Sequence, residues 1–263
     1  MGQTIQNVID GILTAIPEAP LPETVDTFKT GDPEQQVTGV ATTFLANCEV
    51  IEQAIQLGAN LIITHEPTFY NHLDDTGWLS EDAVYQAKRR LIDEHNLMIW
   101  RFHDYWHMHN PDGILTGVLK ELGWEAYASP EMPYFCHIPS MPLRQLAVTL
   151  KDRLGAGPVR LVGDLDMVCQ KIGLALGAAG GEMQIQAFKF GDLDVVVCGE
   201  IHEWETSEYV RDAVYQGNRK ALIVLGHAAS EQAGMKWLAD WLPPRFPGLP
   251  ITYIPVNSPF HWV

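Results

Sequence analysis

The sequence predicts an α/β fold, because short apolar runs of strand length alternate with helix-like segments along the chain. Residues 60–63 and 221–225 have the length and β-branched content of buried parallel strands. Residues 37–43 read as a strand, and Asn47 is a plausible cap for a helix through Gln56 that leads into the run at 60–63. These three segments predict a β-α-β unit with a right-handed crossover and parallel strands.

The remaining elements follow from the same two patterns. Apolar spacing and breaker residues predict helices over residues 4–15, 80–95, 116–122, 143–154, 204–216 and 230–241. Apolar runs predict strands over residues 97–102, 159–162, 171–176, 194–198 and 220–225. The glycine-rich turn at 177–181 does not match the Gly-x-Gly-x-x-Gly spacing, which disfavours a dinucleotide site.

A change of composition predicts two domains. Four prolines fall within residues 127–142, which makes this stretch the best linker candidate in the chain. We therefore expect residues 1–128 and 217–263 to form one α/β domain that bears the histidine-rich strand ends described below. Residues 129–216 would form an inserted second α/β domain.

Composition excludes several classes of function. The net charge of −16, from 33 acidic and 17 basic residues, repels polyanions and makes sequence-independent nucleic-acid binding unfavourable. The longest apolar runs are of strand length, far below the roughly 20 residues of a membrane helix, so we expect no membrane partner. No export signal is recognisable, and we expect a cytoplasmic protein. The four cysteines lack a Cys-x-x-Cys pair, which argues against a thiolate zinc site or a dithiol redox motif.

Histidines and carboxylates follow three of the expected strands. His65 and Glu66 follow the strand at 60–63, a histidine-rich stretch from 102 to 109 follows the strand that begins at 97, and His227 and Glu231 follow the strand at 221–225. Open α/β sheets place their chemistry at the carboxyl ends of their strands. Mixed imidazole and carboxylate ligands suit zinc, manganese or iron, so the three strand ends predict a metal site.

Each cluster has an alternative reading. Ser230 could cap the following helix and Glu231 could simply favour its dipole, instead of binding metal. His103 and His107 would share a helix face, whereas His107 and His109 would share a strand face, so His109 is the rival to His107. The absence of a Gly-x-Ser-x-Gly motif disfavours a serine hydrolase, and His65 has no second histidine at the zincin spacing.

The order of these motifs resembles the Nif-three-like family of dinuclear metal-centre proteins, some of which carry the name type 2 GTP cyclohydrolase I. The family's motifs are Thr-His-His-Pro, His-Thr-x-x-Asp and Gly-His-x-x-Ser-Glu. This chain has Glu66 where the family has its second histidine, and His107 where it has the aspartate that follows His103 by four. The two changes compensate, because three histidines and two carboxylates remain.

The resemblance implies a two-domain α/β/α fold, two divalent transition metal ions (zinc, manganese or iron) and a toroidal homohexamer. It implies the metal ligands His65, Glu66, His107, His227 and Glu231, with His103 as an auxiliary residue behind them.

If the protein is catalytic, a metal-bridged water would hydrolyse a small unknown substrate, with nucleotides and other phosphate-containing molecules among the candidates. Glu66 or Glu200 could act as general base, and Arg101 or Arg160 could hold an anionic substrate. Together with His103, Glu66 and Glu200 are the candidate catalytic residues. The alternatives are a non-catalytic metal-binding scaffold or regulatory interaction protein, and a metal-free structural protein.

Overall fold

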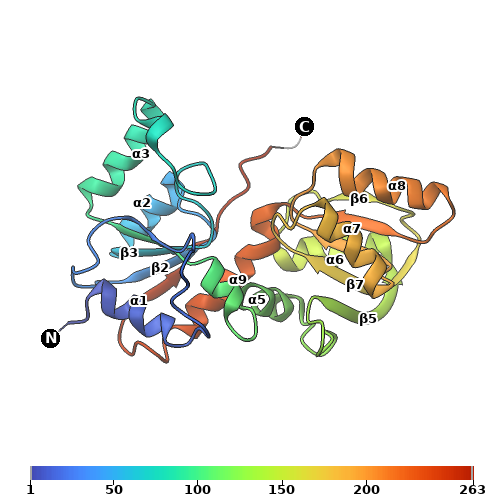
Figure 1. Ribbon diagram of the computed structural model, residues 1–263, viewed down its shortest axis with the longest axis horizontal. Helices are drawn as coiled ribbons and strands as arrows, with labels where there is room; N and C mark the ends of the chain where they lie inside the picture. Colours follow the sequence, from blue (N-terminus) through green and yellow to red (C-terminus); the bar gives the residue numbers. More distant parts are fainter. Residues whose placement is uncertain (1, 262) are drawn as a thin grey trace. The chain divides into compact units, whose positions relative to one another are not determined.

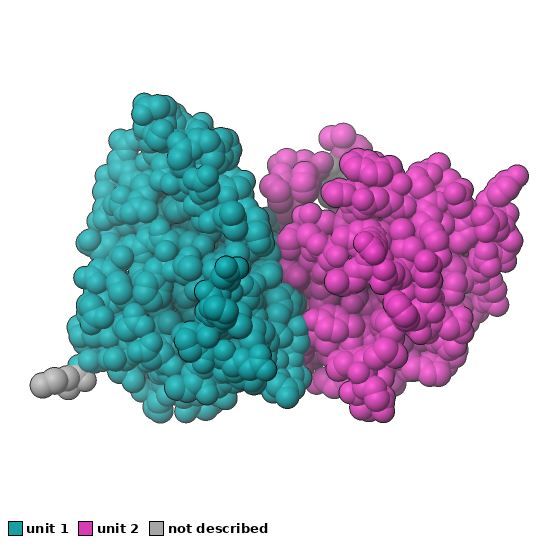
Figure 2. Space-filling view, in the orientation of Figure 1, with its two compact units in different colours: residues 1–114, 234–257 teal, residues 115–233, 258–263 magenta. Residues whose placement is uncertain are grey.

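The computed structural model, which describes residues 2–261 and 263, contains two five-stranded sheets with helices packed against them (Figure 1). The predicted α/β class is confirmed. The chain divides into two compact units, coloured separately in Figure 2. Unit 1 comprises Met1–Ile114 and Gly234–Asn257, and unit 2 comprises Leu115–Ala233 and Ser258–Val263.

Unit 1 is built on a mostly parallel sheet in the order β1-β4-β3-β2-β10. Only β1 runs antiparallel to its neighbour. The three central strands are buried along their whole length, as expected for parallel strands that helices cover on both faces. Figure 1 shows α1 (Ile5–Leu13) on one side of this sheet and α2 (Cys48–Gln56) and α3 (Ala83–Glu94) on the other. The strands are β1 (Phe28–Thr30), β2 (Val40–Thr43), β3 (Leu61–Thr64), β4 (Met98–Arg101) and β10 (Ile251–Tyr253).

Side-chain caps set where α2 and α3 begin. The Asn47 side chain accepts a hydrogen bond from the Val50 N–H, which confirms the predicted cap of α2. Asp82 accepts from two backbone N–H groups and starts α3 at Ala83, three residues later than the sequence pattern indicated. The residues before this cap form the 3-10 turn Gly77–Leu79.

Unit 2 contains a mixed sheet in the order β5-β7-β8-β9-β6. Its three central strands are parallel, and the two outer strands run antiparallel to them. The strands are β5 (Phe135–Pro142), β6 (Arg160–Val162), β7 (Val168–Ala175), β8 (Val195–Cys198) and β9 (Ala221–Val224). The helices α6 (Leu143–Leu154), α7 (Gly181–Gly191) and α8 (Glu208–Tyr215) pack on it, and α8 follows the π-helical turn Glu203–Ser207.

Half of the proline-rich stretch at residues 127–142 is a strand of unit 2, so the stretch is not a linker. Its second half forms β5, which pairs with β7 at the edge of the sheet. The register is irregular between His137 and Met141, the segment that contains Pro139. Edge strands and bulges are the positions in a sheet that tolerate proline, because a proline there removes no ladder hydrogen bond.

The chain returns to unit 1 at Gly234, whereas the sequence suggested residue 217. The reason is that β9 pairs with β8 and β6, which assigns this strand and the following His227 to the second sheet. Two of the three boundaries between the units fall inside helices, α5 (Gly113–Leu122) and α9 (His227–Trp241), and the third lies between Asn257 and Ser258. Among the described residues, no helix has the length and apolar character required to cross a membrane.

A buried lysine fastens the loop that follows β3. Lys88, on α3, is 3% exposed, and its Nζ donates a hydrogen bond to the Thr68 carbonyl at 2.5 Å. Nζ also lies 5.1 Å from the centre of the Tyr70 ring and 5.7 Å from that of Phe69. Burial lowers the pKa of Lys88 to about 8, although the nearby Cys48 and Asp74 act in the opposite direction.

We expect this burial to make stability depend on pH. Between the folded-state pKa of about 8 and the ordinary value of 10.5, the unfolded chain binds a proton that folded Lys88 does not. The free energy of unfolding of the wild type, relative to Lys88→Met, should therefore rise by up to about 3 kcal/mol across this range and stay level below it. Urea unfolding of both proteins from pH 7 to 10 measures this difference, and parallel pH profiles would contradict it.

Candidate metal centre

Adjacent strand ends bring two of the candidate histidines of unit 1, His65 and His103, together. β3 and β4 are parallel neighbours, with Thr64 paired to Arg101, so the chain leaves both strands at the same edge of the sheet. His65 follows β3 directly and is fully buried. Its ring stacks on that of His103 with 4.5 Å between the centroids and 24° between the planes.

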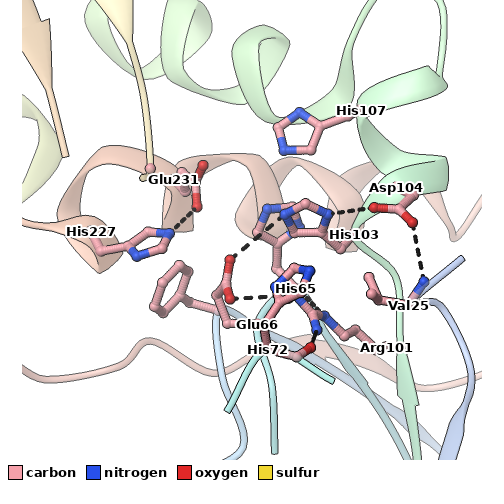
Figure 3. Close-up of polar contacts among 12 residues, drawn as sticks. Val25, His65, Glu66, His72, Arg101, His103, Asp104, His107, His227 and Glu231 are labelled. Carbon is pink, nitrogen blue, oxygen red and sulfur yellow. Dashed lines mark hydrogen bonds and ion pairs between the residues drawn. The ribbon is translucent and has the colours of Figure 1, made fainter. Parts of the chain in front are cut away.

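A third imidazole reaches this group because the residues after β4 form a helix. In α4 (Asp104–Met108), His103 takes the N-cap position and His107 lies one turn later, with its N–H bonded to the His103 carbonyl at 3.1 Å. The two rings are 5.0 Å apart, and the ring of His107 is 5.1 Å from that of His65. One nitrogen of each histidine lies within 4.8 Å of the others. Figure 3 shows the side chains of His65, His103 and His107 in this group.

His109 takes no part in this group. Its Nδ1–H donates to the Pro111 carbonyl at 2.7 Å, and its ring packs against Trp106 and Trp241, with centroids 5.0 and 5.4 Å away. Because residues 104–108 form a helix, His107 lies beside His103. The strand conformation that would have favoured His109 does not form here.

A carboxylate lies beside the three imidazoles. Glu66 Oε1 is 3.8 Å from His103 Nε2, and Glu66 Oε2 is 3.6 Å from the guanidinium of Arg101 (Figure 3). Arg101 is fully buried, so its charge needs a nearby anion. One side of Glu66 thus faces a fixed positive charge and the other faces the histidines.

The two arginines that the sequence suggested for binding an anionic substrate have other partners. Arg101 donates from Nε to the His65 carbonyl at 3.1 Å and from Nη1 to the His72 carbonyl at 2.5 Å. It therefore holds the loop after β3, out of reach of solvent. Arg160 forms an exposed ion pair with Glu203, with 2.7 Å between Nη1 and Oε1.

A buried aspartate fixes the start of α4. The Asp26 carboxylate accepts hydrogen bonds from the backbone N–H groups of His103, Asp104 and Tyr105, at 2.7, 3.1 and 2.8 Å. Burial raises the pKa of Asp26 even though these donors oppose the rise. α4 has five residues, too few to be stable on its own, so this anchor holds the turn that carries the two histidines.

Two further carboxylates hold these histidines by their Nδ1 atoms. Asp104 Oδ1 is 2.9 Å from His103 Nδ1, and Asp112 Oδ2 is 2.8 Å from His107 Nδ1. Burial raises the pKa of Asp104, but the hydrogen bonds from His103, Thr24 and Val25 outweigh it and bring the value below its ordinary range. Sequence reasoning did not assign roles to Asp26, Asp104 or Asp112. Only Asp104 carried a signal, as a carboxylate next to a histidine.

In unit 2, His227 and Glu231 form a pair on α9. The helix begins at His227, earlier than the predicted Ser230, so the two residues lie four apart on one face. His227 Nε2 is 3.0 Å from Glu231 Oε2, and His227 Nδ1 is 3.0 Å from Glu200 Oε1. These residues follow β8 and β9, which are parallel neighbours.

Ser230 does not cap a helix, because it already lies inside α9 with its N–H bonded to the Gly226 carbonyl at 3.1 Å. Its Oγ instead accepts from the Gly177 N–H at 3.0 Å and donates to the His227 carbonyl at 2.8 Å. Gly177 has φ +60°, and a Cβ at this position would run into the Glu231 carboxylate. The alternative of a Ser230 cap is therefore wrong, and the glycine leaves room for the Glu231 side chain.

The donor groups fit a divalent transition metal. Unit 1 supplies three imidazoles whose nitrogens converge, with a carboxylate beside them, and unit 2 supplies an imidazole and a carboxylate in contact. Several of the imidazoles have one nitrogen held by a carboxylate, as is usual for metal-binding histidines. This set of nitrogen and oxygen donors suits zinc, iron or manganese.

Comparison with known proteins agrees with the resemblance in the motifs. The family model described as Duf34/NIF3 (NGG1p interacting factor 3) matches residues 23–259. The GTP cyclohydrolase 1 type 2 homolog of Escherichia coli is 24% identical over 233 residues, which cover 86% of this chain and 87% of that protein. The homolog from Chlamydia pneumoniae is 23% identical over 251 residues, with 89% of this chain and 90% of that protein covered.

Solved structures share the fold. A Bacillus cereus protein related to NIF3 superposes with a TM-score of 0.79 at 17% identity, covering 100% of both chains. A Staphylococcus aureus protein gives a TM-score of 0.78 at 20% identity, covering 99% of both chains. At these identities the likeness establishes the fold alone.

The contact between Gly177 and Glu231 leads to a prediction. Gly177→Ala should destabilise the protein through both its positive φ and the collision with the Glu231 carboxylate. Gly217→Ala is the matched control, because Gly217 has φ +85° and a Cβ there would meet nothing within 4 Å. In urea unfolding, Gly177→Ala should lose at least about 1 kcal/mol more than the control. Equal losses would show that Glu231 moves aside without cost.

The pair of Glu66 and Arg101 leads to a second prediction. Glu66→Gln leaves a buried guanidinium without its anion, whereas the same change made together with Arg101→Gln does not. In a double-mutant cycle on chelator-treated protein, the two residues should couple favourably by about 0.5–3 kcal/mol in the free energy of unfolding. Additive losses would show that the 3.6 Å contact contributes no stability.

Proposed function

This chain belongs to the Duf34/NIF3 family, and we propose that it is a metal-dependent hydrolase with a dinuclear centre. The observation that carries the proposal is the convergence of His65, His103 and His107 within 4.8 Å, with Glu66 beside them. Three buried or half-buried imidazoles at the carboxyl ends of parallel strands are a favourable arrangement for metal binding.

We propose that His65, Glu66, His107, His227 and Glu231 together bind two metal ions. The grouping of these five residues rests on the motif order that the chain shares with its family. Within unit 2, the contact of His227 with Glu231 supports their role as neighbouring ligands. The ions would be zinc, iron or manganese, and self-assembly into a homohexamer is part of the same proposal.

When bound, a pair of divalent metals polarises a substrate oxygen and lowers the pKa of water toward neutrality, which is the chemistry of hydrolysis. Arg101 fixes one side of Glu66, so we assign Glu66 to metal binding in preference to proton transfer. Glu200 is the better candidate proton acceptor, because its side chain is 57% exposed and in contact with His227. The name of the curated relatives, GTP cyclohydrolase 1 type 2 homolog, makes nucleotides the first substrates to test.

The first test is the metal content of untagged protein. We expect about two transition metal ions per chain in the wild type and a loss of metal in both His107→Ala and Glu231→Ala, because each substitution removes one of the proposed ligands. Elemental analysis measures this content. If both variants keep the wild-type metal content, neither residue is a ligand and the proposed ligand set is wrong. A wild type without metal, even after reconstitution, would overturn the proposal.

The second test is turnover by the metal-loaded protein. Phosphoesters, nucleotides and amides should include a substrate whose hydrolysis falls about 100-fold or more in Glu231→Ala. Asp82→Ala is the control, because Asp82 caps α3 and contacts no candidate ligand among its described hydrogen bonds. Metal binding with no turnover on any of these substrates would favour the non-catalytic scaffold.

A further inference from the structure

We propose that His103 is itself a metal ligand that donates through Nε2, and that Asp104 and Asp112 are positioning residues for His103 and His107. This inference rests on the proposed function, since it names how the same site holds its metal. It adds a ligand to the five expected from the family motifs and assigns roles to two aspartates. Asp104 occupies the position of the family's threonine, and His107, the partner of Asp112, occupies that of the family's aspartate.

The orientation of His103 is the first argument. Its Nδ1 lies 2.9 Å from Asp104 Oδ1, so the neutral ring carries its proton on Nδ1 and presents the lone pair of Nε2. Nε2 lies on the side of Glu66, with 3.8 Å to Oε1. The ring that stacks on buried His65 therefore directs its donor atom at Glu66, as Figure 3 shows.

The rigidity of Asp104 is the second argument. Its other oxygen, Oδ2, accepts hydrogen bonds from Thr24 Oγ1 at 2.8 Å and from the Val25 N–H at 3.1 Å. The neighbouring Asp26 holds the backbone of the same turn through three N–H groups. The segment 24–26 thus clamps both the backbone and the side chain of Asp104, and a carboxylate held in this way fixes the ring bonded to it.

His107 repeats the arrangement. Asp112 Oδ2 is 2.8 Å from His107 Nδ1, and the Asp112 side chain is 14% exposed. Where the family motif places a carboxylate, this chain therefore places an imidazole with a carboxylate behind it. Both imidazoles of α4 are oriented by an aspartate and present Nε2, and together with His65 they make a donor set of three imidazoles.

The tautomers can be tested without any metal. In the metal-free protein, with histidine labelled by nitrogen-15, long-range proton–nitrogen spectra should show His103 and His107 protonated at Nδ1. Asp104→Ala should change the His103 signals and leave those of His107, and Asp112→Ala should do the reverse. His103→Gln and His107→Gln assign the signals. A His103 ring protonated at Nε2 in the wild type would overturn the role given to Asp104.

Metal binding tests the ligand role. In competition with a chelator, His103→Ala should bind zinc at least about 100-fold more weakly, and Asp104→Ala and Asp112→Ala about 10- to 100-fold more weakly. Asp104→Asn should lose less than Asp104→Ala, because its side-chain oxygen can still accept the His103 Nδ1–H. Asp82→Ala, which removes a helix cap elsewhere in unit 1, should keep the wild-type affinity. Thermal unfolding monitors the fold of each variant.

The visible spectrum of cobalt(II)-loaded protein separates a ligand from a neighbour. Loss of a ligand changes the coordination of the metal, so His103→Ala should alter this spectrum as His107→Ala does. If His103→Ala keeps the wild-type spectrum and affinity while His107→Ala and Glu231→Ala lose metal, this inference fails and the proposed function stands. If the wild type binds no metal, both fail.

Discussion

The buried guanidinium of Arg101 is the interaction on which the arrangement of unit 1 depends. It stands at the end of β4, yet its hydrogen bonds go to the carbonyls of His65 and His72, which lie in the loop after β3. One fully buried side chain thus satisfies two backbone acceptors of this loop. The same guanidinium also attracts the Glu66 carboxylate. Arg101 therefore holds both the backbone of the loop and the carboxylate beside the candidate centre.

This explains how the chain tolerates a carboxylate where its family has a histidine. A glutamate in a partly buried loop needs a cation or several donors nearby, and Arg101 supplies the cation from the adjacent strand. At position 107 the exchange runs the other way, from carboxylate to imidazole, and Asp112 supplies the carboxylate behind the ring. Each departure therefore has a compensating residue that lies close in space, although only Asp112 is also near in the sequence.

Sequence reasoning identified the strand ends and the histidines, because buried parallel strands are recognisable as apolar runs and their carboxyl ends are where chemistry collects. It could not choose between His107 and His109, since that choice required knowing that a five-residue helix forms after β4. Asp26, which anchors this helix, lies 77 residues before His103, a separation that no local pattern reveals. The cap suggested for Ser230 was wrong for a similar reason, because α9 starts about one turn earlier, at His227. The Ser230 hydroxyl instead accepts a hydrogen bond from Gly177, which follows β7.

The distribution of donors bears on which metal suits the centre. In unit 1, three imidazoles converge, while the carboxylates of Asp104 and Asp112 contact the Nδ1 atoms of His103 and His107. The negative charges of these two aspartates thus lie near the site without contacting a metal directly. They polarise the imidazole rings, which makes the Nε2 atoms better donors. Imidazole nitrogen suits zinc and iron, whereas carboxylate oxygen suits manganese and magnesium. Because position 107 carries an imidazole with Asp112 behind it, we expect unit 1 to favour zinc or iron, with Glu66 as the adjacent oxygen donor.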